Sequence, residues 1–210
     1  MHIPDGFLSG NINLATYAIS AAIGGYSVKR CNKDFGDKHV PLLGVTSAFI
    51  FAAQMLNFPV AGGTSGHFLG AALAAILMGP YAACLIMTLV LIIQCLGFAD
   101  GGLSALGSNI FNMGIIGGFG SYYIFITLKA IFPKSKGGFM VAAFITSWLS
   151  VMLASGFCAV ELAASGTSPL KIVLPAMLSV HSVIAVGEAI ITTTVLSVVF
   201  ASRPDLVTTS

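Results

Sequence analysis

The feature that most constrains this chain is its succession of long apolar runs. Between polar or glycine-rich breaks there are about seven such runs, at roughly 11–28, 41–58, 66–79, 80–97, 109–129, 138–160 and 171–201. Most of them approach the ~20 residues that a helix needs to cross a hydrocarbon layer of ~30 Å. Because a lipid-facing backbone must satisfy its own hydrogen bonds, such runs fold as packed helices. The sequence therefore predicts an all-α fold, a polytopic membrane helical bundle of about seven transmembrane helices.

The composition excludes a soluble domain. Only 8% of the 210 residues are charged, 57% are hydrophobic, and the mean hydropathy is +0.98. These values are typical of a membrane protein. We expect a single transmembrane domain over 1–210, with an N-terminal segment at 1–10 and the bundle at 11–201, in the cell's inner or plasma membrane as a multi-pass protein. No nucleic-acid partner is expected.

The basic residues are distributed unevenly between the two predicted sides. On one side they are Lys29, Arg30, Lys33 and Lys38 after the first run, Lys129, Lys134 and Lys136 after the fifth, and Arg203 after the last. Only Lys171 falls on the other side. Since cytoplasmic loops carry the excess of Lys and Arg, this pattern predicts the N-terminus outside and the C-terminus in the cytoplasm.

The chain has no nucleotide-binding loop and no cysteine cluster. No segment matches the G-x-x-x-x-G-K-[ST] pattern, so energy for uphill transport would have to come from an ion gradient or a partner protein. The cysteines, Cys31, Cys84, Cys95 and Cys158, lack C-x-x-C spacing. We interpret them as small core residues without disulfides.

The first residues can chelate a metal. The start lacks a positive n-region and carries Asp5 before the first apolar run, so no cleaved signal peptide is expected, and the bulky His2 should preserve Met1. The Met1 amine, the His2 backbone nitrogen and His2 Nδ1 can close two fused chelate rings, which leaves a fourth in-plane position. A planar nitrogen site suits Ni(II) or Cu(II), and less strongly Co(II). A histidine at position 2 also arises by chance, so this segment alone does not define a site.

His67 is the candidate partner for this segment. It ends a loop rich in Gly, Ser and Ala, and the run that follows has only about fourteen residues, which make ~21 Å of helix. We therefore predict that His67 starts a helix below the outer surface, where a buried N-terminal tail could meet it.

Other polar groups lie in or beside the apolar runs. His181 and Glu188 share one face of the last run and could be functional or could make helix-to-helix hydrogen bonds. Side chains that could orient a metal-bound imidazole are Asp5, Asn57, Thr64, Ser65, Asn109, Asn112 and His181, with loop capping and interhelical bonding as the alternative roles. Asp100 and Glu161 are predicted to be exposed outer residues.

Four stretches together resemble the CbiM/NikM family, the substrate-capturing membrane components of energy-coupling factor (ECF) transporters for cobalt and nickel. They are the start Met-His-Ile-Pro-Asp-Gly-Phe-Leu at 1–8, the loop 59–67, the pair 98–103 and 109–114, and His181 with 187–189. The resemblance extends from residue 1 to about residue 200. Many cobalt members have a glutamate-bearing start in place of Pro4-Asp5, which favours nickel here without settling it.

The resemblance implies a transporter subunit. Its site would use Met1, His2 and His67, with transported Ni(II) or Co(II) as the ligand and no catalytic cofactor. Its partners would be a transmembrane coupling (T) protein, cytoplasmic ABC-type ATPases that hydrolyse the ATP, and a possible small additional membrane subunit. In related capture components an Ala-x-x-x-Ala face meets the coupling protein; the candidates here are Ala18 with Ala22 and Ala48 with Ala52. Such small residues also serve packing within a bundle.

Two other functions stay open at this point. One is a stand-alone ion-coupled metal carrier. The other is an intramembrane metal-dependent enzyme that uses His67, His181 and Glu188, although the chain has no H-E-x-x-H motif.

Overall fold

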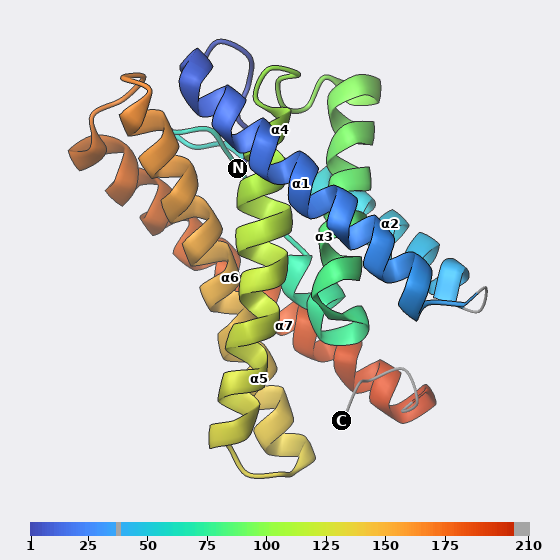
Figure 1. Ribbon diagram of the computed structural model, residues 1–210. Coiled ribbons are helices and arrows are strands. Elements are labelled where there is room, and N and C mark those ends of the chain that lie inside the picture. The colour runs from blue at the N-terminus through green and yellow to red at the C-terminus, as the bar shows by residue number, and fades with distance from the viewer. Residues whose placement is uncertain (37–38, 204–210) are drawn as a thin grey trace.

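The computed structural model describes residues 1–36 and 39–203 (Figure 1). Lys38, one of the basic residues used to predict the orientation, lies outside this range. The helical elements are α1 (Gly10–Asp34), α2 (Val40–Gln54), α3 (Ala71–Phe98), α4 (Leu106–Ile110), the π-helix η2 (Phe111–Gly120), α5 (Ser121–Ile131), α6 (Lys136–Ala164) and α7 (Leu170–Ser202). Two short strands, β1 (Asn57–Pro59) and β2 (Ser65–His67), form an antiparallel pair. The predicted predominantly helical membrane fold is confirmed, with this small hairpin added.

Four helical stretches in the described part of the chain are long and apolar enough to cross a membrane. They are Ala71–Phe98, Leu106–Ile131, Lys136–Ala164 and Leu170–Ser202; the last three correspond to runs predicted from the sequence. The apolar helix α2 is shorter, with 15 residues. The count of about seven spans and the orientation of the termini stay predictions.

The predicted runs 66–79 and 80–97 form one element, α3, which is broken at Gly79. The backbone of Gly79 has φ 83° and ψ 174°, a conformation that a residue with a Cβ rarely adopts. Pro80 follows and has no N–H to continue the helical hydrogen bonds. The glycine-rich break seen in the sequence is therefore a turn between two helical segments of α3.

The prediction that His67 starts a helix is wrong. His67 ends β2, where it pairs with Asn57 of β1, and the helix begins only at Ala71. The run predicted at 41–58 is likewise too long, because α2 ends at Gln54 and the chain enters β1. The hairpin turn is closed by the hydrogen bond from Val60 N to Thr64 O at 2.9 Å. Strand pairing thus satisfies the backbone at both ends of a segment that the sequence predicted to be a loop between two helices.

Glu188 of α7 holds the start of α3. Its carboxylate accepts hydrogen bonds from Leu69 N and Gly70 N, and the side chain is buried. A carboxylate at a helix N-terminus satisfies free N–H groups and interacts favourably with the helix dipole. Of the two interpretations of Glu188, this contact supports the structural one.

The helix α1 runs diagonally along one face of the bundle and packs against α4 and α3 (Figure 1). Ser20 Oγ donates to Gly107 O at 2.8 Å, and a Cβ at Gly107 would lie 2.6 Å from Tyr17 N. The close crossing therefore requires glycine at 107. This contact between α1 and α4 anchors the segment 99–109, part of which contacts the N-terminal tail.

Candidate metal site

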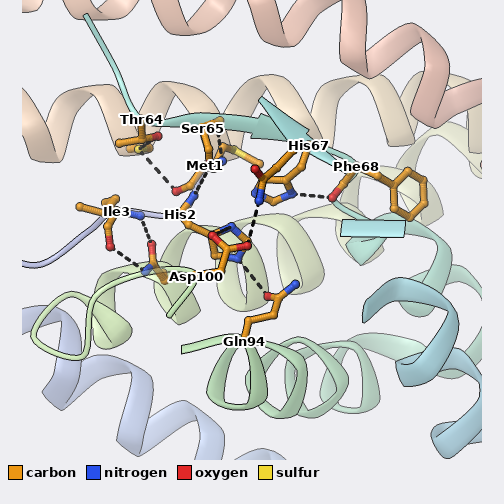
Figure 2. Close-up of polar contacts among 12 residues, drawn as sticks. Met1, His2, Ile3, Thr64, Ser65, His67, Phe68, Gln94 and Asp100 are labelled. Atoms are coloured by element: carbon orange, nitrogen blue, oxygen red, sulfur yellow. Dashed lines mark hydrogen bonds and ion pairs between the residues drawn. The ribbon is translucent and has the colours of Figure 1, made fainter. Parts of the chain in front are cut away.

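The N-terminal tail lies inside the protein although it precedes the first helix. Met1 and Ile3 are fully buried and His2 is 4% exposed. The Met1 amine donates to the backbone carbonyl and the hydroxyl of Ser65, and His2 N donates to Ser65 Oγ at 3.1 Å. Figure 2 shows the tail running beside β2, so that its first nitrogens face the loop that ends in His67.

Asn109 of α4 sets the register of the tail. Its Oδ1 accepts from Ile3 N at 2.8 Å, and its Nδ2 donates to Ile3 O at 3.1 Å. Gly102 N also donates to Ile3 O, and a Cβ at Gly102 would lie 2.2 Å from Asp5 N, so only glycine fits beside the tail. Asn109 was predicted to orient an imidazole; it instead binds the backbone next to His2.

The imidazoles of His2 and His67 stack, with ring centroids 4.4 Å apart and an interplanar angle of 24°. His2 Nε2 lies 3.0 Å from Gln94 Oε1, and His67 Nδ1 lies 2.7 Å from Phe68 O (Figure 2). Because carbonyl oxygens only accept hydrogen bonds, these two nitrogens carry the protons. His2 Nδ1 and His67 Nε2 therefore keep their lone pairs, and both are buried without a hydrogen-bond partner.

Burial keeps all three groups uncharged. It lowers the pKa of the Met1 amine to about 5, against weaker opposing effects of Cys158 and Asp100. It lowers the pKa of His2 to about 3, assisted by the adjacent amine, and that of His67 well below its ordinary value. At neutral pH the amine and both imidazoles can thus donate lone pairs, the form in which nitrogen binds metals.

Asp100 provides the nearest negative charge. Its Oδ1 lies 3.3 Å from His2 Nδ1, and its side chain is only 18% exposed. Burial raises the pKa of Asp100, while the Met1 amine and the hydrogen bond from Asn57 lower it. Asn57 Nδ2 donates to Asp100 Oδ2 at 3.0 Å and so holds the carboxylate that lies beside His2.

The remaining predicted residues have other hydrogen-bond partners in the structure. The exposed Asp5 accepts from Ser104 N and Oγ, at 2.7 and 2.6 Å, and so holds the tail to the 99–105 loop. Thr64 Oγ1 faces the sulfur atoms of Cys158 and Met177. His181 Nδ1 pairs with Met177 O at 2.7 Å, and its Nε2 is buried without a hydrogen-bond partner.

Sequence reasoning missed three polar residues. Gln94 was not singled out, although a lone amide in the apolar run 80–97 was an available signal. Asp100 and Glu161 were predicted to be exposed, and both predictions are wrong. Asp100 faces His2, and the buried Glu161 accepts from Asn112 Nδ2 at 2.6 Å. Both acidic residues turn inward because buried amide or imidazole nitrogens lie opposite them.

The donor set of this site is unusual. Across residues 1–36 and 39–203, no group of three or more His, Cys, Asp or Glu side chains is placed to hold a metal. The nitrogens that converge here come from one free amine, one backbone position and two imidazoles (Figure 2). Such a set can bind a metal that prefers nitrogen ligands in a plane.

The apolar helices define a multi-pass membrane protein, and its first residues are buried inside the protein. Residues 2–206 match CbiM, the cobalt uptake substrate-specific transmembrane region, and the chain belongs to this family. It is 46% identical over 209 residues to a putative fused nickel transport protein NikMN of Archaeoglobus fulgidus, covering 99% of this chain and 68% of that protein. It is 40% identical to a putative metal transport protein of Haloquadratum walsbyi, covering 100% and 94%. The crystal structure of a truncated transition metal transporter superposes with a TM-score of 0.88 at 34% identity, covering 96% of this chain and 99% of that one.

Proposed function

We propose that this protein captures Ni(II) or Co(II) as the substrate-specific component of an ATP-driven, ECF-type importer. The observation that carries the proposal is the buried convergence of the Met1 amine, His2 Nδ1 and His67 Nε2, with both imidazole lone pairs unpartnered. The metal is the transported substrate. Membership of the CbiM family and the transition-metal transporter fold support the same function.

In this proposal the ligands are the Met1 amine, the His2 backbone nitrogen, His2 Nδ1 and His67 Nε2. Ser65 holds the amine and the backbone nitrogen in position before the metal arrives. Gln94 and the Phe68 carbonyl hold the two imidazoles in the tautomers that leave the required lone pairs.

Charge balance supports a divalent ion. Binding through the His2 backbone nitrogen removes its proton and leaves one negative charge. The Asp100 carboxylate, 3.3 Å from His2 Nδ1, supplies a second when it is ionised. A dication would then be neutralised inside the protein, which avoids the high free energy of an uncompensated buried charge.

Selectivity follows from the donor set. A planar nitrogen field suits Ni(II), whereas Zn(II) prefers tetrahedral and Mg(II) octahedral oxygen-rich sites. The family description names cobalt and the Archaeoglobus relative is named for nickel, so both ions belong to the proposal.

The importer would need the coupling protein, ABC-type ATPases and a possible small membrane subunit as partners. Ala18 and Ala22 on α1, and Ala48 and Ala52 on α2, are exposed in this chain. Small residues let helices approach closely, so both faces suit a helix of a partner membrane protein. In the proposed orientation the metal is captured from the outer side and released to the cytoplasm.

Metal titration tests the capture step. The protein should be purified with an untagged N-terminus, and intact mass should verify that the chain begins at Met1. Ni(II) titration should then give a one-to-one, diamagnetic complex whose absorption is typical of a planar site, with far weaker Zn(II) binding. A paramagnetic nickel complex, or equal affinity for Zn(II), would contradict the proposed ligand set.

Reconstitution tests the energy source. Vesicles that contain this chain alone should not accumulate nickel when an ion gradient is imposed. Vesicles that also contain the coupling protein and ATPases should accumulate nickel when ATP is supplied. Gradient-driven uptake by the chain alone would support the stand-alone carrier instead.

A further inference from the structure

A second candidate binding feature lies at the end of the molecule where α5 and α6 join, far from the N-terminus (Figure 1). A pocket of about 580 Å³ lies there between the α5–α6 turn and the C-terminal part of α7. Lys129, Lys134 and Lys136 line it together with Phe139 and Phe200. None of the residues described above as part of the metal site reaches it.

The lining of this pocket is amphipathic. Among the described residues that line it, Lys134 and Lys136 carry positive charge and none has a carboxylate. The apolar part of the lining comes from Phe139 and Phe200, whose rings pack edge to face with their centroids 4.8 Å apart. Lys136 Nζ lies 6.0 Å from the Phe200 ring, so the charged and apolar parts are directly adjacent.

The surface next to the pocket is apolar and exposed. Ile126 lines the pocket and is 41% exposed, and Ile131 in the last turn of α5 is 72% exposed. Long lysine side chains near the ends of membrane helices reach the headgroup interface, so this surface fits the boundary between the hydrocarbon layer and the headgroups. A ligand in the pocket can therefore contact the lysines and the hydrocarbon layer together.

We propose that this pocket binds an anionic phospholipid. Lys134 and Lys136 bind the phosphate of the headgroup, and Phe139 and Phe200 contact the glycerol and the first acyl carbons. Free phosphate would gain nothing from the apolar lining, and an acidic protein segment would not need the adjoining lipid-facing surface. Each lysine near the headgroup region favours an anionic lipid by about fivefold.

Lipid retention tests this proposal with two matched double variants. K134Q/K136Q removes two charges from the pocket, and K29Q/K33Q removes two charges from the end of α1. Each purified protein is titrated with phosphatidylglycerol or phosphatidylcholine, and the bound lipid is counted by native mass spectrometry. We expect wild type and K29Q/K33Q to prefer phosphatidylglycerol equally, and K134Q/K136Q to lose about twenty-five-fold in phosphatidylglycerol affinity.

Several outcomes would overturn the proposal. One is equal retention of both lipids by wild type, and another is an equal loss of phosphatidylglycerol affinity in the two variants. A third is displacement of the bound lipid when inorganic phosphate is added at the same concentration. Ni(II) titration of both variants should match wild type. This readout is independent of the lipid count, so failure of the lipid proposal is distinguishable from failure of the proposed metal site.

Discussion

Blocking the Met1 amine should abolish tight metal binding. Met1 is fully buried, and its amine contacts both the carbonyl and the hydroxyl of Ser65. Acetylation converts the amine into an amide, whose nitrogen binds a metal only after it loses its own proton, so the neutral amine ligand is lost. An additional residue before Met1 has the same effect and must also occupy space that the buried tail already fills.

Acetylation and extension should reduce the Ni(II) affinity by different factors. Loss of an outer partner of a metal ligand costs about 10–100-fold in affinity, and loss of a ligand that closes a chelate ring should cost at least roughly 100-fold. An added residue also displaces the Met1 side chain, whose burial contributes about 1.5–3 kcal/mol, or roughly a further tenfold or more. The extended chain should therefore bind more weakly than the acetylated one.

Calorimetric titration of Ni(II) into the purified proteins measures both effects. A C-terminal tag of the same length as the N-terminal extension serves as the control and should leave the affinity unchanged. A single cooperative thermal unfolding transition in each protein would show that the bundle stays folded. Nickel affinity within twofold of wild type, after either change to Met1, would refute the assignment of the amine as a ligand.

Three further predictions concern residues that hold the site. His67→Ala should leave a nitrogen set that binds Ni(II) at least roughly 100-fold more weakly and discriminates less against Zn(II), which competition titration measures. Gln94→Leu removes the acceptor that keeps the proton on His2 Nε2, so Ni(II) affinity should fall by about 10–100-fold while the fold persists; an unchanged affinity would exclude this positioning role. Lowering the pH from 8 to 5 should release the tail by at least about tenfold per unit, because the released amine binds a proton below its ordinary pKa of 8.0 whereas the buried amine does so only near a pKa of about 5. Below about pH 6.5 the slope should steepen, because the released His2 imidazole also binds a proton, whereas the buried imidazole has a pKa of about 3. Amide hydrogen exchange at Ile3, measured against pH without metal, checks this slope, and flat protection between pH 8 and 5 would contradict it.

The helices that were predicted well are those whose length is determined by the membrane. The runs 138–160 and 171–201 correspond to α6 (Lys136–Ala164) and α7 (Leu170–Ser202) within a few residues at each end. A continuous apolar run bounded by polar residues needs no information from other parts of the chain to form a helix.

The hairpin could not be predicted in the same way. Asn57 and His67 lie at the ends of two apolar runs, and their neighbours favour helix extension as readily as a strand. A strand of three residues forms only when a partner strand supplies its hydrogen bonds, and the carboxylate of Glu188, from a distant helix, holds the chain beyond it. The context dependence of short strands explains the error.

The amino-acid sequence by itself determined the chelating chemistry of the tail. The Met1 amine, the His2 backbone nitrogen and His2 Nδ1 belong to adjacent residues, so the ability to close chelate rings follows from covalent geometry. Only the tertiary structure decided whether these nitrogens are buried, which tautomers the imidazoles adopt and that the Asp100 carboxylate lies beside His2. Ser65, Gln94 and Asn109 impose those states from 63, 92 and 106 positions away along the chain. Desolvation and hydrogen bonding depend on neighbours in space, which is why the sequence could name the donor atoms but not their protonation or their surroundings.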